Sequence, residues 1–511
     1  MIGADPVNEA AARRWLWWFL VTTLVFRLWL SVAMPLTGDE AYFLVWGERP
    51  DIGYYDHPPM VGWMLAVLAR LSNAEWVLRL PATLLPVVLA LAARAALTRW
   101  FGTGRVAADL AAVLILLVPM NVWNVLVTTD TPLILFSFGA MLLFARAAQR
   151  SSGTGFFLSG VCLGLAFLSK YFAVLLGLGM IASVLVGRGG RSGWRGLALV
   201  FLGALPAGLL NLYWNYEACW SNIMFNAINR HEGAGLGWKN PLLFVAAMAY
   251  LAAPLLWYAW RERRRIAASM NDPGRSTLVF AWLVPLAIFA LLAPLKKIGL
   301  HWLLSFIPLL VLSLAIALPA EKLRRCAMVL AAIALLHGGG AVVLWAVPLE
   351  TWQSSRLYSR LVLQFRTAEV VEKLRPFAGY QTATDNYTLS SILSYYAGRY
   401  YFVFGAGTSH ARHDDIVTDV RSFDGKDIMI VRRDPPPEQD YRPYFRAIEL
   451  RSVEVAGTTV HVVLGKGFDY AAYREGVLRQ VRDRWYRIPA ALPVGHCYFC
   501  EKYFPGEACG R

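Results

Sequence analysis

Long apolar runs separated by short polar stretches form the pattern of this chain up to about residue 350. Most of these runs have the length of a helix that crosses a bilayer. They cover residues 15–35, 77–98, 106–123, 131–148, 155–169, 171–187, 196–214, 241–260, 277–294, 300–318 and 326–347. The pattern predicts an α-helical polytopic membrane domain over residues 1–350, with about 11 transmembrane helices.

Basic residues follow the alternation of these runs. Five loops rich in arginine and lysine fall on one side of the expected bilayer, the side that also holds Arg13 and Arg14; they lie at 99–105, 146–150, 188–195, 261–265 and 322–325. A Lys/Arg excess marks cytoplasmic loops, so the opposite loops are expected outside. The least certain division is at Lys170, because runs 155–169 and 171–187 could fuse into one span. Fusion would place the later arginine-rich loops on the outer side, which favours two helices.

Composition supports a membrane protein. Hydrophobic residues make up 57% of the chain, charged residues 16%, and the mean hydropathy is +0.46. No ordinary soluble fold hides that much apolar surface. The net charge of +15 would suit nucleic acid, but many of the basic residues lie in short loops between spans. We therefore expect membrane lipid, and not nucleic acid, as the partner of these charges.

The pattern changes after residue 350. Short β-like runs occur at 428–431 and 460–464, and a helix-like stretch at 387–396 follows a polar Thr-Asp-Asn that can cap it. Residues 468–485 have the alternation of an amphipathic helix. These features predict a C-terminal α/β domain over residues 351–511, outside the membrane.

Cysteines cluster near the C-terminus. Cys497, Cys500 and Cys509 lie beside His496 and could ligate zinc or form a disulfide, and Cys219 lies in a loop between spans. An oxidising outer compartment favours the disulfide. No catalytic metal is expected.

Residues 37–59, TGDEAYFLVWGERPDIGYYDHPP, hold unusual charges beside the first apolar run. Carboxylates so close to hydrocarbon are costly, and this favours a function for them. We interpret Asp39, followed by Glu40, as a catalytic carboxylate at the outer surface of the bilayer. The alternative is a simple helix start capped by Thr37 or Asp39. Asp130, in VTTDTP, allows the same two interpretations.

Cations and aromatic residues collect on the same outer loops. Lys170 is either a lysine whose charge reaches the interface or a ligand of a lipid phosphate. Transfer from a polyprenyl phosphate needs a carboxylate to activate the acceptor hydroxyl and cations to stabilise the leaving phosphate. The candidates for phosphate binding are Lys170, His57, Arg230, Lys296 and Lys297. The candidates for substrate binding are Tyr54, Tyr55, Asp56, His231 and His301.

Motifs for ATP, dinucleotide or zinc-protease chemistry are not found, so no cofactor is expected. In order along the chain, GDEAYFLVWGE, GYYDHPPMVGW, TTDTPLILF, LGLAFLSKYFAVLL, NLYWNYEACWSNIMFN and HWLLSFIPL resemble the bacterial membrane glycosyltransferases of the GT-C fold. This family includes the lipid A aminoarabinose transferase and protein O-mannosyltransferases. The resemblance covers roughly residues 10–350, and TDNYTLSSILSYYAG in the C-terminal part is also similar.

The resemblance implies a polyprenyl-phosphate sugar donor, an inverting mechanism, and a site between the membrane domain and its outer loops. Asp39 matches the aspartate taken as general base, Asp130 the second-loop aspartate, and Lys170 the lysine of the FLSKY motif. Asp56 and His57 match an acidic–basic pair before Pro-Pro. The basic member is lysine in the aminoarabinose-transferase branch, so His57 indicates a different branch.

The leading hypothesis is an enzyme that transfers a sugar from a polyprenyl-phosphate donor at the periplasmic face of the bacterial inner membrane. The acceptor is lipid A, another part of lipopolysaccharide or another envelope glycan; a protein acceptor is the alternative. A flippase or carrier of lipid-linked sugar is the alternative of another class. It is disfavoured because transporters place charges at mid-membrane in repeated, broken helices. A third hypothesis is an envelope scaffold.

Overall fold

The chain forms two compact units in a computed structural model that describes residues 8–187, 190–231 and 235–507. The first unit consists of Met1–Met34, Ser72–Leu209 and Gly233–Leu344. The second consists of Pro35–Leu71, Leu210–Glu232 and Trp345–Arg511. The expected domain boundary at residue 350 lies close to Trp345, but the second unit also takes in two earlier stretches of the chain.

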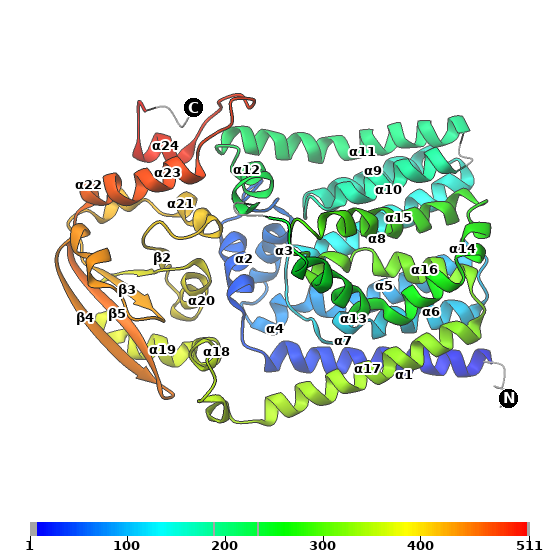
Figure 1. The fold of residues 1–511 in the computed structure, drawn as a ribbon, viewed down its shortest axis with the longest axis horizontal. Coiled ribbons are helices and arrows are strands. Elements are labelled where there is room, and N and C mark those ends of the chain that lie inside the picture. Colours follow the sequence, from blue (N-terminus) through cyan, green and yellow to red (C-terminus); the bar gives the residue numbers. More distant parts are fainter. Residues whose placement is uncertain (1–7, 188–189, 232–234, 508–511) are drawn as a thin grey trace. The chain divides into compact units, whose positions relative to one another are not determined.

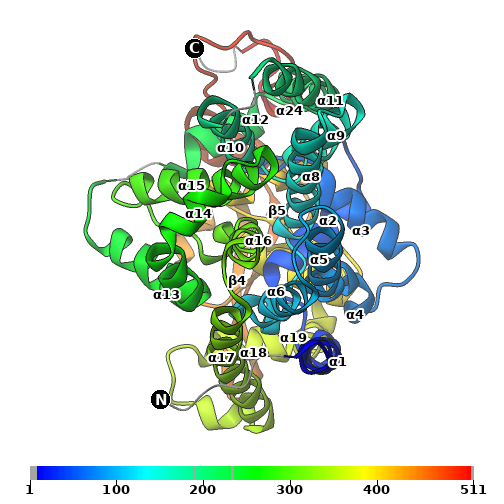
Figure 2. The same cartoon turned by 90° about the vertical axis from the view of Figure 1, so that its right-hand side faces the viewer.

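The first unit is a helical bundle (Figures 1 and 2). Among the described residues, eight helices are long and apolar enough to cross a membrane. The bundle's helices are α1 (Glu9–Ala33), α4 (Glu75–Leu78), α5 (Leu80–Arg99), α6 (Arg105–Leu117), α7 (Pro119–Trp123), α8 (Asp130–Arg150), α9 (Gly153–Phe167), α10 (Ala173–Val186), the first part of α11 (Gly190–Glu217), α13 (Lys239–Arg261), α14 (Arg263–Ser269), α15 (Pro273–Leu292), α16 (Ile307–Ala317) and α17 (Ala320–Ala346).

A helix overlaps each of the predicted spans, so the polytopic α-helical fold is confirmed. The chain breaks around Lys170, since α9 ends at Phe167 and α10 begins at Ala173. The structure therefore has two helices where the sequence allowed one fused run. The number of membrane crossings stays a prediction.

The helices of the bundle differ in how much of their apolar surface is buried by other helices. Helix α16 lies at the centre of the end-on view (Figure 2), and almost all of its side chains are buried together with those of α6. Helix α17 exposes most of its apolar side chains, as a lipid-facing helix does. The apolar side chains of α6 and α16 thus form the core of the bundle, whereas those of α17 form a surface that can face lipid.

A buried arginine joins helix α1 to its neighbours. Arg27 is 1% exposed and donates hydrogen bonds to four backbone carbonyls, those of Ala82, Thr83, Asn121 and Asn124. An unsatisfied cation is costly at membrane depth, so it must meet oxygen atoms inside the protein. Arg27 finds them in the first turns of α5 and in the chain around α7.

The second unit contains a five-stranded mixed sheet with strand order β2-β1-β3-β5-β4. Strands β2 (Phe402–Val403), β1 (Gln381–Thr384) and β3 (Ile428–Arg432) are parallel, whereas β5 (Thr458–Phe468) is antiparallel to β3 and to β4 (Phe445–Val455). In register, Ala383 pairs with Ile430, which pairs with Val463. The helices of this unit are α2 (Gly38–Glu48), α3 (Met60–Ala69), α12 (Ser221–Ala227), α18 (Tyr358–Phe365), α19 (Thr367–Lys373), α20 (Tyr387–Ala397), α21 (Asp414–Val417), α22 (Tyr470–Tyr473), α23 (Arg479–Trp485) and α24 (Tyr498–Tyr503).

Local sequence explains these C-terminal elements. The Asn386 side chain accepts a hydrogen bond from the Leu389 amide and caps α20, which ends at Gly398 in the left-handed region. Ala456 and Gly457, both with positive φ, form the two-residue turn between β4 and β5. The predicted strands, the capped helix and the α/β class are confirmed. The expected helix 468–485 is divided among α22, a π-helical turn (Arg474–Leu478) and α23.

One hydrophobic core joins the separate stretches of the second unit. Tyr55, Cys219 and Phe225 pack in the same cluster as Ile430 and other residues of the sheet. A disulfide between Cys219 and Cys497 adds a covalent link across 278 positions. Cys500 is also disulfide-bonded, and Cys509 lies outside the described residues. The disulfide interpretation of Cys497 is therefore correct, and a disulfide sulfur is not available as a thiolate ligand for zinc.

We expect the C219S and C497S variants to lower the free energy of unfolding of the second unit by about 2–5 kcal/mol, because a cross-link between distant positions restricts the unfolded chain. Thermal unfolding of the detergent-solubilised protein, followed by circular dichroism, measures the change. C162S is the matched control, since Cys162 is a free cysteine of the first unit. Equal unfolding of C219S and C162S would contradict this role.

Candidate active site

Helix α2 begins with a capping box that separates the roles of its two acidic residues. The Thr37 hydroxyl accepts a hydrogen bond from the Glu40 amide at 3.3 Å, and Glu40 Oε2 accepts one from the Thr37 amide at 3.0 Å. Glu40 is 2% exposed, whereas Asp39 is exposed. The helix-cap interpretation thus describes Thr37 and Glu40, and Asp39 keeps an accessible carboxylate.

Asp39 lies against helix α20. The Tyr387 hydroxyl donates a hydrogen bond to Asp39 Oδ1 at 3.2 Å. Gly38 permits this approach, since a Cβ at that position would lie 2.7 Å from Thr388 Cβ. Only a residue without a side chain brings α2 this close to α20. The backbone around Gly38 therefore decides where the Asp39 carboxylate lies.

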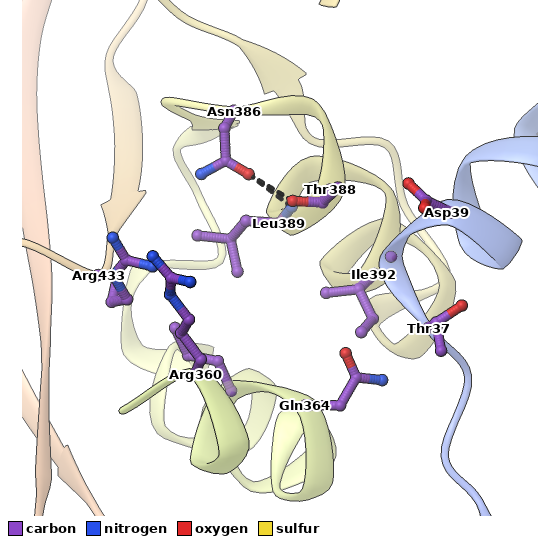
Figure 3. A pocket seen from close by; sticks show the side chains of 11 residues that line it. Thr37, Asp39, Arg360, Gln364, Asn386, Thr388, Leu389, Ile392 and Arg433 are labelled. Atoms are coloured by element: carbon purple, nitrogen blue, oxygen red, sulfur yellow. Dashed lines mark hydrogen bonds between the residues drawn. The ribbon is translucent and has the colours of Figure 1, made fainter. Parts of the chain in front are cut away.

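A pocket of about 400 Å³, lined by both polar and apolar residues, opens beside Asp39 (Figure 3). In the view, Thr37 and Asp39 lie on one side, and Arg360 and Arg433 lie on the other. The remaining lining residues are Gly38, Leu363, Gln364, Asn386, Thr388, Leu389 and Ile392. Every one of these residues belongs to the second unit. The volume is in the range of small-molecule sites.

Helix α12 and the 3₁₀ helix that follows it fix the GYYDHPP stretch through side-chain amides. Asn222 donates to the Tyr54 carbonyl at 2.8 Å, Asn226 to the Asp56 carbonyl at 2.9 Å, and Asn229 to the Tyr55 hydroxyl at 3.2 Å. Tyr54 and Tyr55 are fully buried, and the Tyr54 ring stacks on Trp46 with 4.5 Å between centroids. Both tyrosine rings therefore pack inside the protein.

Asp56 is a buried carboxyl group in this unit. It is 4% exposed, and the Tyr42 hydroxyl donates to its Oδ1 at 3.3 Å. The pKa of Asp56 is raised to about 7: burial raises it most and the Asp39 charge adds to this, whereas a backbone hydrogen bond, the Tyr42 hydroxyl and the Arg230 guanidinium lower it. Burial also lowers the pKa of Arg230, which lies over the Phe225 ring at 5.6 Å. Asp56 therefore ionises near neutral pH, beside a cation.

Three residues of this cluster were not among the candidates from the sequence. Tyr42 joins Asp56 to the His410 carbonyl, which accepts its hydroxyl proton at 3.3 Å. The His410 ring stacks on the Tyr387 ring with 5.8 Å between centroids, and burial lowers the pKa of His410. Tyr42 lies in GDEAYFLVWGE and Tyr387 in TDNYTLSSILSYYAG, two of the stretches that carry the resemblance, whereas nothing in the sequence singles out His410.

His57 and His231 are the other histidine candidates of this unit. The His57 ring lies 6.3 Å from the Phe43 ring and 6.2 Å from the Trp46 ring, between centroids. His231 ends a short 3₁₀ helix (Asn229–His231). Its side chain lies outside the described part of the structure.

The first unit holds a second group of candidates. Lys170 Nζ donates to both carboxylate oxygens of Asp130 at 2.9 Å, and both side chains are almost fully buried. His301 Nε2 lies 3.8 Å from Asp130 Oδ2. Asp130 is the first residue of α8, and its neighbour Thr129 occupies the cap position without a side-chain cap bond. Lys170 is thus a buried ion-pair partner and does not reach into solvent.

Aromatic rings extend this group. Lys170 lies 5.2 Å from the centroid of the Phe172 ring, which is 4.7 Å from the Trp302 ring. Lys296 Nζ lies 5.8 Å from the Trp302 ring centroid, and Lys297 is exposed. Cations over aromatic faces are attracted by the ring quadrupole. The structure therefore brings Asp130, Lys170 and His301 together and places Lys296 against Trp302.

We expect stability of the second unit to depend on Asp56 between about pH 4 and pH 7. The folded protein keeps a proton on Asp56 up to about pH 7, whereas the unfolded chain releases it near the ordinary value of 3.8. The stabilisation from neutral Asp56 is therefore complete below pH 4 and is lost, by about 2–4 kcal/mol, as the pH rises to 7. Thermal melts across this range should show a smaller loss in D56N; equal losses would contradict the shift.

We expect the K170M variant to destabilise the first unit by about 3–5 kcal/mol, because it leaves the Asp130 carboxylate buried without its cation. The double variant D130L/K170M should recover most of that loss. Titration with SDS of the detergent-solubilised protein measures the four free energies of a double-mutant cycle. Additive effects of D130L and K170M would show that the pair is not coupled.

Comparison with known proteins extends these observations. Residues 56–214 match the family described as dolichyl-phosphate-mannose-protein mannosyltransferase. The chain is 27% identical over 293 residues to the lipid A galacturonosyltransferase RgtD of Rhizobium johnstonii, a match that covers 55% of this chain. It spans 62% of that relative's length.

Solved structures share the fold. The crystal structure of ArnT from Cupriavidus metallidurans bound to undecaprenyl phosphate superposes with a TM-score of 0.65 at 17% identity, covering 88% of this chain and 98% of that one. The apo form gives 0.64 at 17% identity, covering 89% and 98%. The family match over residues 56–214, the sequence relative and the shared fold agree with the motifs found in the sequence: the chain is a multi-pass membrane protein that has the fold of ArnT and is similar to membrane glycosyltransferases.

Proposed function

We propose that this protein transfers a sugar from a polyprenyl-phosphate donor to lipid A, another part of lipopolysaccharide or another envelope glycan. The observation that carries the proposal is the exposed Asp39 carboxylate, held by Tyr387 beside a pocket. The sequence relative is named for transfer of galacturonic acid to lipid A, and the ArnT structure holds undecaprenyl phosphate. These names support a lipid-linked donor and a glycolipid acceptor here.

In the proposed reaction Asp39 is the general base. Its carboxylate takes the proton of the acceptor hydroxyl as that oxygen forms a bond to the anomeric carbon of the donor sugar. The bond from this carbon to the phosphate oxygen breaks, and the polyprenyl phosphate leaves with the electron pair. Attack from the face opposite the phosphate inverts the configuration. The Tyr387 hydroxyl orients the carboxylate through its hydrogen bond.

Cations have the second role in the proposed reaction. The leaving phosphate gains negative charge, which nearby positive groups stabilise. We assign this role to Lys170, Lys296 and Lys297 in the first unit and to Arg230 and His57 in the second. Asp130 holds Lys170 through the bidentate contact at 2.9 Å, and we assign substrate contacts to His301 and His231.

The buried candidates support the site in a different way. We assign Glu40 to the capping box that begins α2, because its carboxylate oxygen already accepts the Thr37 amide. We assign Tyr54, Tyr55 and Asp56 to positioning, since all three are almost fully buried. Ionised Asp56 attracts Arg230, so its protonation sets the charge beside Asp39.

Membrane placement forms part of the proposal. We place the protein in the bacterial inner membrane, with residues 351–511 as a periplasmic domain. The Cys219–Cys497 disulfide supports an oxidising compartment for the second unit, whereas Cys162 and Cys326 of the first unit are free. The excess of basic residues on the opposite loops supports the same orientation.

A protein acceptor is the second candidate. The family matched by residues 56–214 is described as a protein mannosyltransferase, which favours it. The sequence relative favours lipid A and extends over a longer part of the chain. Offering lipid A and an unmodified envelope-protein extract in parallel to the purified enzyme separates the two acceptors.

We expect D39N to lower the sugar transfer rate by about 10²–10⁴-fold, because an amide cannot accept the hydroxyl proton. The assay uses purified protein in nanodiscs with undecaprenyl-phosphate hexose, pentose and hexuronate donors, followed by mass spectrometry of the acceptor. Donor binding should be retained in D39N, and Y387F should have a smaller effect. D440N is the matched control, an exposed aspartate of the same unit. Wild-type transfer by D39N, or donor translocation without transfer, would overturn the proposal.

A further inference from the structure

The wall of the pocket opposite Asp39 carries two arginines. Arg360 comes from α18, and Arg433 directly follows strand β3. Figure 3 shows both guanidinium groups on the same side of the pocket. Arginine side chains repel one another unless an anion lies close to both. The two arginines therefore need a negatively charged group nearby.

The described part of the chain supplies one such group. Arg433 pairs with Asp434 at 2.7 Å, and the Asp434 side chain is 62% exposed. The hydrogen bonds from Arg433 lower the pKa of Asp434 most, and the charges of Arg433, Arg432 and Arg360 lower it further. Arg360 itself forms no hydrogen bond or ion pair with any residue of 8–187, 190–231 or 235–507. One exposed carboxylate thus faces two guanidinium groups, and the donors of Arg360 are available to a ligand.

The other polar side chains of the pocket are already engaged. Asn386 Oδ1 accepts from the Leu389 amide at 2.9 Å and from the Thr388 hydroxyl at 2.8 Å. The Gln364 amide donates to the Leu36 carbonyl. Leu363 and Ile392 add apolar surface. The frame is therefore fixed by internal bonds, and the unused hydrogen-bonding capacity lies with the arginines on one side and Asp39 on the other.

We propose that Arg360 and Arg433 form an anion subsite that binds a phosphate or carboxylate of the acceptor glycan and thereby selects acidic acceptors. Guanidinium groups bind both oxyanions in a planar, two-bond geometry. The subsite deepens the proposed function and rests on it, since Asp39 on the opposite wall would meet a hydroxyl of the same glycan. A pocket of about 400 Å³ has room for a sugar with its acidic group.

The acceptor fits this pocket better than the donor does. All of its lining residues come from α2, α18, α20, their flanking residues and the end of β3. None of these elements is among the helices long and apolar enough to cross a membrane. A polyprenyl chain needs an apolar surface, whereas an acidic glycan needs water-accessible donors. The chemistry of the lining therefore matches the glycan.

Binding titrations without donor test the subsite. Wild-type protein in nanodiscs is titrated with phosphorylated lipid A, with lipid A stripped of its phosphates, and with stripped lipid A carrying a carboxylate. We expect R360Q and R433Q each to weaken binding of phosphorylated lipid A about 10-fold, and the double variant more, because each loses charge-assisted hydrogen bonds. Binding of the stripped lipid should change less than about 2-fold.

R375Q is the matched control, an arginine of the same unit whose side chain is 74% exposed and pairs with Glu372. Unchanged melting temperatures verify that the variants fold. Binding of the carboxylated lipid, lost in the same variants, assigns the subsite to carboxylates; selective binding of the phosphorylated lipid assigns it to phosphate. The proposal is overturned if wild-type protein does not prefer an acidic lipid, or if R360Q and R433Q bind as R375Q does.

Failure of the subsite and failure of the proposed function give different results. Titration without donor measures the subsite alone, and the D39N assay measures transfer. Acid-selective binding with no transfer to any acceptor would remove the enzymatic proposal and keep the subsite. Transfer that depends on Asp39, with equal binding of acidic and stripped lipid, would remove the subsite and keep the enzyme.

Discussion

The hydrophobic core of the second unit is the constraint on which its polar cluster depends. Tyr55 and Phe225 come from two loops between apolar runs, yet both pack in one core with the sheet of the C-terminal domain. Burial of large aromatic side chains provides most of the favourable free energy in such a core. Because these loops must bury their rings there, the charged residues beside them are brought to fixed positions. Asp39 and Asp56 thus lie near Tyr387, and Arg230 lies near Asp56, through packing of their neighbours.

Hydrogen bonds and a disulfide then fix the backbone around this core. Side-chain amides from α12 satisfy two carbonyls of the GYYDHPP stretch, so its backbone can be buried without unpaired acceptors. The Cys219–Cys497 disulfide restrains the chain just before those amides. Glu40 closes the first turn of α2 and leaves Asp39 exposed. Residues that are adjacent in sequence therefore have opposite tasks, one holding the backbone and the other facing solvent.

In the helical bundle, buried charged groups are neutralised or hydrogen-bonded by partners inside the protein. Lys170 and Asp130 neutralise each other in a buried pair, and Arg27 is satisfied by four carbonyls. Unpaired charge is too costly at that depth, so each buried ion has a defined partner. In the pocket of the second unit the charges are not balanced one to one. Two arginines lie near one exposed carboxylate, and this arrangement is stable only where water or a ligand supplies the remaining contacts.

Local patterns along the chain predicted the class of the fold and most of its elements. Hydrophobic periodicity gave the helical spans, the break at Lys170, the strands around Ile430 and Val463, and the helix capped by Asn386, because these depend on local pattern and capping. Motifs also selected Asp39, Asp130 and Lys170. The burial of Glu40, Tyr54 and Tyr55 depends on packing between distant segments. So does the hydrogen bond to Asp39 from Tyr387, which lies 348 positions away. Local pattern carries no information about which distant side chains share a core, and that packing set the surroundings of each charge.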